Sequence, residues 1–364
     1  MSEFNLIQKY FTRPTRHTDL GVGDDAALLS VADGMQLVIS TDMSVAGTHF
    51  FADAAPYDIG WKALAVNVSD MAAMGAEPKW ATLALALPGI SPSPLQGEGW
   101  DGGGNAALIS TLEPTPTLAL PLKEAGNVSE TWLAEFSRGF FACADAFKID
   151  LIGGDTTKGP LNISVTIMGE VPIGKALKRS GAQVGDDIWV SGQLGSAALV
   201  LAHLKNKIGQ SKIKLENDTL EANSHALHRP TARVNLGLKL RDIATSCIDI
   251  SDGLLADLGH ILKASNCGAV IDLEKIPCIN LLKSNLDNPQ FQTLILAGGD
   301  DYELCFTAKP SQRKAINLLR KQLNISITRI ASTCIASGLN TDGLQAIYRN
   351  NEIKLLKQGF DHFG

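Results

Sequence analysis

Strand-like and helix-like segments alternate along this 364-residue chain, and that order predicts a mixed α/β (α+β) fold. Residues 161–168 alternate apolar and polar side chains as a strand does, whereas residues 57–74 repeat with the helical period. The first half predicts strands at 35–42, 80–87, 148–152 and 161–168 and helices at 4–12, 57–74 and 129–147. The second half predicts strands at 188–191, 246–250, 268–272 and 302–307 and helices at 194–206, 254–265 and 310–322.

The composition suits an aliphatic α/β core, because hydrophobic residues make up 45% of the chain and aromatic residues only 6%. The length allows two domains, and a polar, glycine-rich stretch at 172–187 predicts the boundary between them. We therefore expect domains at 1–175 and 176–364. Residues 91–127 are rich in Pro, Gly and Ser and show neither period, which predicts a disordered insert within the first domain.

Charge and hydropathy argue against several classes of protein. The net charge is −6 and the chain has no long basic run, so we expect no nucleic-acid partner. No stretch approaches 18 consecutive apolar residues and the first ten residues lack a signal-peptide core, so we expect no membrane association. The six cysteines form no Cys-x-x-Cys pair, which favours reduced thiols and a cytoplasmic location.

Six aspartates lie in short turn-like segments that contain Gly, Ser or Thr, and they are Asp25, Asp42, Asp70, Asp155, Asp249 and Asp252. Taken one at a time, such an Asp is more often a turn or helix-cap residue. Carboxylates are also the ligands that Mg²⁺ takes, usually one or two per ion, with phosphates and waters completing the shell. The number of these turns therefore predicts several metal ions and a phosphate-rich ligand.

Local context strengthens the metal hypothesis for some of the six. Asp42 ends a predicted strand and follows Ser40 and Thr41, which add further oxygens. Asp70 lies on an apolar helix face beside Asn67, where an uncompensated charge would be costly to bury. Asp252 stands where the next helix should begin, and helix N-termini favour bound phosphate.

Phosphoryl transfer between two phosphates would explain so many carboxylates. Two like unit charges about 4 Å apart repel by about 4 kcal/mol at an effective dielectric near 20, and Mg²⁺ ions would neutralise that charge. A phosphate acceptor is already anionic, so no strong general base is needed. The segment from Gly169 to Lys175 fits a P-loop pattern only partly, because Ala176 replaces the Ser or Thr and Pro172 removes an amide.

Six ordered motifs resemble the thiamine-monophosphate kinase family of the aminoimidazole ribonucleotide synthetase superfamily. They are Gly21-Val-Gly-Asp-Asp25, Ser40-Thr-Asp42, Asn67-Val-Ser-Asp70, Gly153-Gly-Asp155, Ile248-Asp-Ile-Ser-Asp252 and Gly298-Gly-Asp-Asp-Tyr-Glu303. The resemblance implies a two-domain fold whose N-terminal sheets form a barrel across a homodimer, followed by a C-terminal α/β domain. It also implies phosphorylation of thiamine monophosphate to thiamine diphosphate by ATP and several Mg²⁺ ions, with residues 1–175 binding ATP and metal.

The resemblance also implies a role for individual residues. Asp42, Asp155 and Asp252 match catalytic positions. The matching metal ligands are Asp25, Ser40, Thr41, Asp42, Asp70, Asp155, Asp249 and Asp252. The nucleotide contacts match Gly154, Asp155, Arg179 and Ser251, and the substrate contacts match His49, Asp300 and Phe360. A purely structural interpretation also stays open for His49 as a surface histidine, Arg179 as a solvated linker charge and Phe360 as a core anchor. Asp300 stands where the family has Glu.

Two other hypotheses about the function are compatible with the sequence. The chain could be a non-catalytic nucleotide-binding or divalent-cation-binding protein, since acidic turns alone do not require turnover. It could also be another ATP-dependent enzyme of the superfamily. Selenophosphate synthetases have a reactive residue near the N-terminus, but the first cysteine here is Cys143. Hydrogenase-maturation proteins end in Cys, whereas this sequence ends in Gly364.

Overall fold

The computed structural model describes residues 3–91, 128–207, 213–337, 339, 343–353 and 359. The segment predicted to be a disordered insert falls almost entirely outside these residues, and so does Phe360. In the part of the chain that is described, no helix is both long and apolar enough to cross a membrane.

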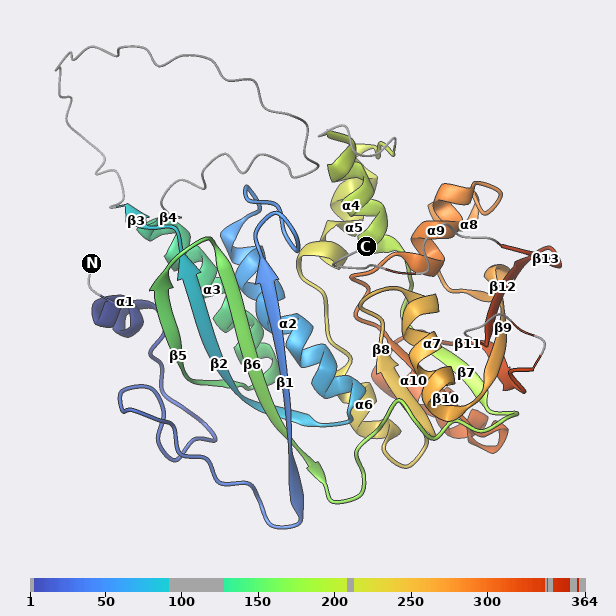
Figure 1. Cartoon of the computed structure of the whole chain (residues 1–364), viewed down its shortest axis with the longest axis horizontal. Coiled ribbons are helices and arrows are strands. Elements are labelled where there is room, and N and C mark those ends of the chain that lie inside the picture. Colours follow the sequence, from blue (N-terminus) through green and yellow to red (C-terminus); the bar gives the residue numbers. More distant parts are fainter. Residues whose placement is uncertain are drawn as a thin grey trace.

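The N-terminal half is a four-stranded sheet with helices on one face (Figure 1). Its strand order is β1 (Met35–Val45), β6 (Asn162–Pro172), β2 (Glu77–Leu87) and β5 (Asp150–Lys158). Within this sheet β2 and β5 run parallel, and the other two pairs of neighbouring strands run antiparallel. The covering helices are α2 (Pro56–Ala73) and α3 (Glu130–Phe147), and the short helix α1 (Glu3–Tyr10) packs near β5.

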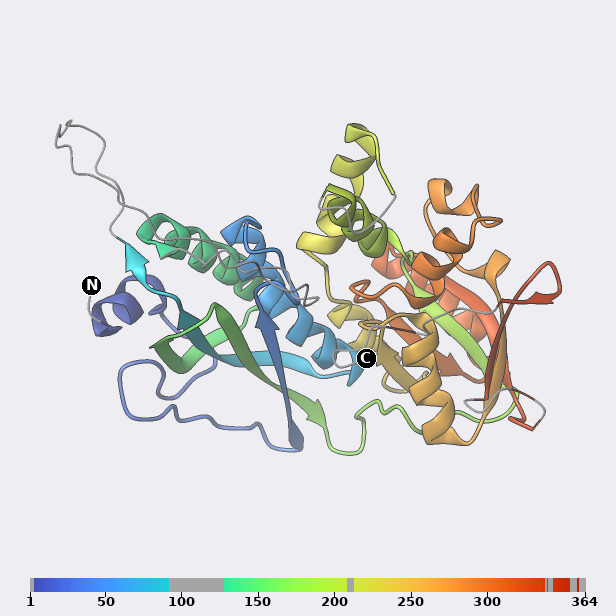
Figure 2. The ribbon, with the colours of Figure 1, turned by 45° about the horizontal axis from the view of Figure 1, so that its top comes forward.

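Helix α2 is the central element of the fold. Pro56 begins it, and Gly75 with φ of 62° follows its last turn, as the sequence predicted. It packs tightly on α3, because a Cβ on Gly139 would lie 1.9 Å from the Tyr57 carbonyl oxygen. Figures 1 and 2 show α2 between the N-terminal sheet and the C-terminal half, where it contacts α6 (Val234–Leu240) and β8 (Ser246–Asp249).

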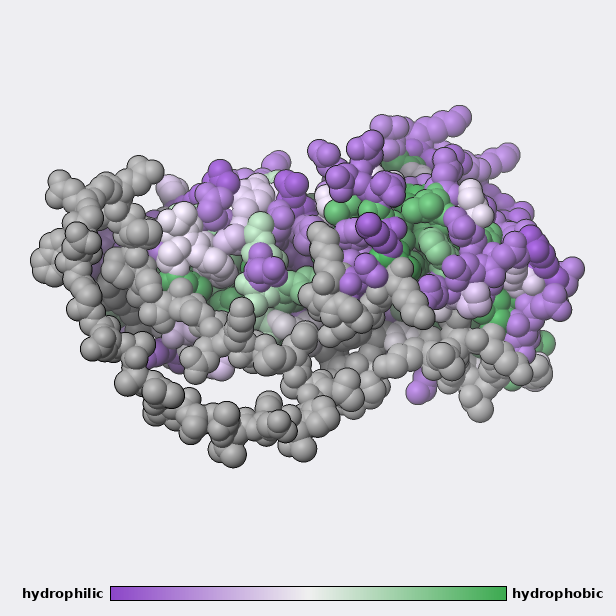
Figure 3. Space-filling model, turned by 90° about the horizontal axis from the view of Figure 1, so that it is seen from above, coloured by the Kyte–Doolittle hydropathy of each residue, from purple (hydrophilic) through white to green (hydrophobic). Residues whose placement is uncertain are grey.

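The C-terminal half contains a seven-stranded mixed sheet. Its order is β13 (Asn351–Glu352), β12 (Leu344–Tyr348), β9 (Gly268–Asp272), β11 (Ile327–Cys334), β7 (Asp187–Ser191), β10 (Leu304–Ala308) and β8. The described helices of this half, besides α6, are α4 (Ser196–Lys207), α5 (Asn217–His228), α7 (Leu254–Ser265), α8 (Asn280–Lys283), α9 (Pro289–Ala297) and α10 (Arg313–Leu323). The face seen in Figure 3 is mainly hydrophilic over these helices, with hydrophobic residues between them.

One hydrophobic core crosses from the N-terminal half into the C-terminal half. Val68 and Met71 on α2 are fully buried in it, together with Phe306 on β10. Trp189 stacks on Phe306 with ring centroids 6.4 Å apart. The boundary at 175/176 stays a prediction, and the shared core implies that the two halves stabilise each other.

Most predicted strands and helices are confirmed within a few residues. Weak or short periods in the sequence gave little local signal for α5, α6, α9, β11 and β12, which were not predicted. Two predicted turns are strands instead: Asp42 lies within β1, which runs on to Val45, and residues 153–157 continue strand β5. Gly154 allows this, because a Cβ there would lie 1.8 Å from the Leu83 carbonyl oxygen on β2.

The ends of the segment at 92–127 lie side by side. A two-stranded parallel ladder pairs Ile90 with Val128 and Ser91 with Ser129. The chain therefore leaves and re-enters the fold at one place, where a surface segment can lengthen at small entropic cost.

Candidate active site

Carboxylates from both halves meet beside helix α2. Asp42 lies on β1, Asp70 on the last turn of α2 and Asp249 at the end of β8. The Ser40 hydroxyl donates to Asp70 at 2.5 Å, and the Ser69 hydroxyl donates to Asp249 at 2.7 Å. We call Asp42, Asp70, Asp249 and the neighbouring Asp252 the acidic cluster.

The local structure explains this convergence. Burial alternates along β1, so Ser40 and Asp42 share the side of the strand that faces α2. The Asp42 amide donates to the Asn67 side chain at 3.2 Å, which fixes β1 against the helix. Ser69 precedes Asp70 and turns toward β8, so α2 contacts both strands that carry carboxylates.

The electrostatics of the acidic cluster fit a divalent cation. Burial raises the pKa of Asp42 to about 6, and the charges of Asp70 and Asp252 add to the shift. Burial also raises the pKa of Asp249, with a further contribution from Asp70. Burial raises the pKa of Asp70 as well, although the Ser40 hydroxyl and the Arg179 charge oppose the change. Mutual repulsion of this kind is what a bound cation relieves.

Among the described residues, no three acidic, His or Cys side chains are arranged as a ready metal site. Mg²⁺ commonly binds through one or two carboxylates, with substrate phosphates and waters supplying its other ligands. The acidic cluster fits that mode of binding, in which a nucleotide and metal would enter together.

Asp257 holds the loop that carries Ser251 and Asp252. One of its carboxylate oxygens accepts the backbone N–H groups of Ser251, Asp252 and Gly253 at 3.0, 3.0 and 3.1 Å. Burial, with the charges of Asp249 and Asp252, raises the pKa of Asp257 to about 7. Asp257 was not among the predicted site residues, although an Asp in the first turn of a predicted helix is a recognisable signal.

The segment from Gly298 to Glu303 borders the same cluster. The Asp300 amide donates to the Ser251 carbonyl at 2.8 Å, which places the two candidate loops in contact. Asp300 forms an ion pair with Lys62 of α2 at 2.7 Å and accepts a hydrogen bond from Tyr302 at 3.1 Å. Lys62 was not singled out from the sequence, because it lies in a distant helix, and Tyr302 entered only as part of the motif that ends at Glu303.

The other predicted residues near β1 differ in placement. Thr41 points to the opposite face of the sheet, where its hydroxyl lies 2.9 Å from that of Thr166, so only its backbone could join the acidic cluster. The His49 ring nitrogen Nδ1 accepts from the Val45 amide at 3.0 Å in the loop after β1. Arg179 is close enough to Asp70 for its charge to oppose the rise that burial causes in the pKa of that carboxyl.

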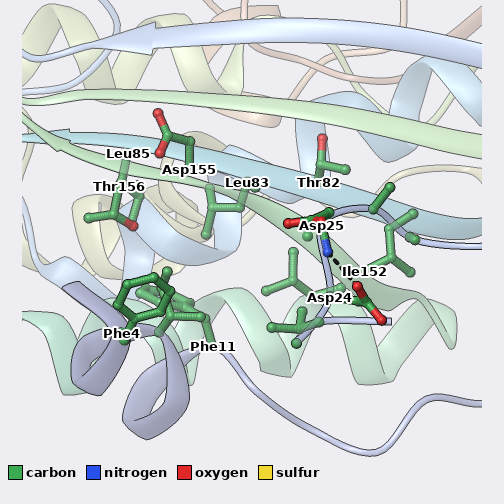
Figure 4. Close-up of a pocket in the computed structure, with 18 residues that line it drawn as sticks. Phe4, Phe11, Asp24, Asp25, Thr82, Leu83, Leu85, Ile152, Asp155 and Thr156 are labelled. Atoms are coloured by element: carbon green, nitrogen blue, oxygen red, sulfur yellow. Dashed lines mark hydrogen bonds between the residues drawn. The ribbon is translucent and has the colours of Figure 1, made fainter. Parts of the chain in front are cut away.

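A second group of predicted residues lines a cavity of about 530 Å³ at the other edge of the sheet. Figure 4 shows Asp25 and Asp155 in the wall of this cavity, with Phe4 and Phe11 on its apolar side. Gly154 lines it as well. The Asp25 amide donates to the Asp24 carboxylate at 2.9 Å, which shapes the glycine-tight turn.

The sheet separates the two groups. Asp42 on β1 lies opposite Val165 on β6. Val165 lies opposite Leu83 on β2, which in turn lies opposite Gly154, the neighbour of Asp155. Three steps of about 4.8 Å between strands make about 14 Å, far more than two Mg–O bonds of about 2.1 Å can bridge. Within one chain, Asp42 and Asp155 are therefore not brought together.

The chain matches both domains of one class of proteins, the AIR synthase related proteins. Residues 23–109 and 114–171 match the N-terminal domain of AIR synthase related proteins, and residues 183–331 match the C-terminal domain. Hydrogenase maturation protein HypE has the same fold, with a TM-score of 0.67 at 18% identity over 98% of both chains.

Closer relatives are thiamine-monophosphate kinases. The Salmonella typhimurium kinase is 40% identical over 99% of this chain and 98% of its own length, and the Bacillus subtilis kinase is 30% identical over 100% of both. The Stenotrophomonas maltophilia kinase, known from a crystal structure, is 41% identical in sequence; the match covers 94% of each chain with a TM-score of 0.73. AaThiL, solved with AMPPCP and TMP, is 27% identical over 99% of this chain and 96% of its own, with a TM-score of 0.67. The chain belongs to the thiamine-monophosphate kinase family.

Proposed function

We propose that this enzyme transfers a phosphoryl group from ATP to thiamine monophosphate in a Mg²⁺-dependent reaction that yields thiamine diphosphate. The observation that carries the proposal is the acidic cluster, where carboxylates from β1, α2 and β8 meet in a chain that matches these kinases from end to end. The final step of thiamine diphosphate synthesis would then take place in the cytoplasm.

The proposed site residues fall into three groups, which would bind metal, nucleotide and thiamine monophosphate. The acidic cluster, with Asp25, Ser40, Thr41 and Asp155, would hold Mg²⁺, which when bound neutralises phosphate charge. Gly154, Asp155, Arg179 and Ser251 would bind the nucleotide. His49, Asp300 and Phe360 would bind thiamine monophosphate. The acceptor oxygen is anionic without help, so orientation and charge neutralisation are the contributions required of the chain.

We further propose that the active enzyme is a homodimer in which one site draws on both chains. The open face of the N-terminal sheet exposes Leu37, Ile39 and Met43, all on β1, with exposed fractions of 42%, 58% and 55%. Adjacent apolar side chains on an open sheet favour packing against a second sheet. A barrel formed in this way would bring β1 of one chain toward β5 of the other.

Such pairing would also explain the separation of the predicted ligands. Asp42 and Asp155 lie on opposite edges of one sheet, so a shared metal requires Asp155 of a second copy. The two acidic groups would then complete each other across the interface.

A direct assay tests the reaction. The protein is incubated with ATP, MgCl₂ and thiamine monophosphate, and thiamine diphosphate is followed by thiochrome fluorescence after chromatography. We expect product that depends on ATP and disappears with excess EDTA, and we expect Asp42→Asn to lower kcat at least about 100-fold. ATP binding without product would instead support a binding protein or a different acceptor.

A further inference from the structure

The Lys62–Asp300 ion pair joins the two halves of the molecule at the acidic cluster. The Lys62 ammonium lies 2.7 Å from the Asp300 carboxylate, and their side chains are only 16% and 26% exposed. Tyr302 donates to the same carboxylate oxygen at 3.1 Å. The pair is thus partly shielded from solvent, where charged groups interact more strongly than on an open surface.

The backbone holds Asp300 in an unfavourable conformation. Asp300 and Tyr302 have φ values of 69° and 49°, in the left-handed region that non-glycine residues rarely adopt. Their neighbours anchor the segment: Asp301 accepts from the Gly195 amide at 3.0 Å, and Glu303 forms a two-point ion pair with Arg233. Strain that the surroundings enforce is typical of ligand-binding segments.

Helix α2 presents Lys62 toward the same site. Lys62 and Ser69 are seven residues apart, so they lie on one face of the helix two turns from each other. Ser69 donates to Asp249 of the acidic cluster. This face of α2 therefore extends from Lys62 to Ser69, which lies beside the carboxylates that would hold the metal and, through the metal, the phosphate.

We propose that Lys62 binds the phosphate of the acceptor, so that the Lys62–Asp300 pair recognises a zwitterionic substrate. This inference rests on the proposed function. Thiamine monophosphate joins a cationic ring to an anionic phosphate through a short linker. Asp300 matches the ring charge and Lys62 matches the phosphate charge. An ammonium has three N–H donors, so the contact with Asp300 leaves capacity for a phosphate oxygen.

The pair would also select against the unphosphorylated vitamin. Thiamine carries the ring cation without the phosphate, so Lys62 repels it and offers it no compensating contact. A lone Asp300 would bind both compounds through the ring. Lys62 therefore shifts affinity toward the phosphorylated compound, an example of specificity obtained by repelling the wrong ligand.

The test compares Lys62→Met and Lys62→Arg with wild type. Kinetic assays give kcat and the KM values for thiamine monophosphate and ATP, and calorimetry without ATP gives the affinities for thiamine monophosphate and thiamine. Lys175→Met is the matched control, because Lys175 forms an exposed ion pair with Asp242 at 2.5 Å away from the cluster. Asp300→Asn serves as the comparison for loss of the ring contact, and thermal melting checks the fold of each variant.

We expect Lys62→Met to raise the KM for thiamine monophosphate about tenfold, with the KM for ATP within about twofold of wild type. Its affinity for thiamine should rise, whereas Asp300→Asn should weaken both compounds. Lys62→Arg should retain most of the affinity for the phosphate, and Lys175→Met should behave as wild type.

Three results would overturn the inference: an unchanged KM for thiamine monophosphate, an equal loss of both ligands in Lys62→Met, or thiamine binding too weak to measure in every protein. Failure of the proposed function itself looks different. In that case wild type makes no thiamine diphosphate, while calorimetry still reports whether Lys62 contributes to binding the phosphorylated compound.

Discussion

Mixing two inactive variants should restore activity if each site uses both chains. Asp42 lies on edge strand β1 and Asp155 on edge strand β5, about 14 Å apart by the spacing of strands. We expect Asp42→Asn and Asp155→Asn, each alone, to lower kcat at least about 100-fold, as loss of a metal ligand should. A mixed dimer would contain one site with both substitutions and one site with neither.

The expected activity follows from counting intact sites. Two differently tagged chains, one with each substitution, are expressed together, and the mixed dimer is isolated by sequential affinity steps. That dimer should show about half of the wild-type kcat per dimer, because one of its two sites is intact. Random exchange of equal amounts without purification should give about a quarter, since about half of the dimers are mixed.

The opposite arrangement makes a different prediction. If each site took Asp42 and Asp155 from the same chain, every site in the mixed dimer would carry one substitution. Activity would then stay at the level of the single variants. Sedimentation of the purified species verifies the dimer, so a monomer with full activity would refute the reasoning as well.

The remaining predictions concern stability and the segment at 92–127. Asp257→Ala should lower the free energy of unfolding by about 3 kcal/mol in urea titrations, since one buried and two partly buried N–H groups lose their acceptor. Asp257→Asn should cost about 1 kcal/mol, because it keeps an acceptor oxygen and removes a repelled charge. Replacing residues 92–127 by a short Gly-Ser linker should leave kcat within about twofold, because the flanking strands are paired. Burial alone would raise the pKa of Asp187, but hydrogen bonds from Arg313 and Arg329 outweigh burial and lower that pKa. The ionised Asp187 therefore stabilises the fold fully above about pH 4, and this stabilisation is lost as the pH falls through the lowered pKa. Arg313→Met should therefore make unfolding less sensitive to pH below about pH 4.

A specific result would contradict each of these three predictions. Equal stability of Asp257→Ala and wild type would show that the loop before α7 does not depend on that carboxylate. A large loss of turnover after shortening of 92–127 would assign this segment a role in the reaction. An unchanged acid transition in Arg313→Met would show that the Arg313–Asp187 ion pair contributes nothing to the pH dependence.

The sequence by itself determined the elements with a clear local period. The strand at 161–168 and the helices at 57–74 and 254–265 were predicted within a few residues, because alternation and the helical repeat are properties of neighbouring residues. The acidic motifs and the family were also readable, since short turn sequences are local. The helix at 217–228 was missed, as few of its side chains are buried and its period is weak.

Only the tertiary structure decided which of the predicted residues meet. It joined Asp42, Asp70 and Asp249 around α2 and separated Asp155 from them by the width of a sheet. It also paired Lys62 with Asp300, two residues with no local relation in the sequence. Such proximity depends on the order of strands and the packing of α2 between two sheets, which are long-range consequences of burial that no local pattern of residues specifies.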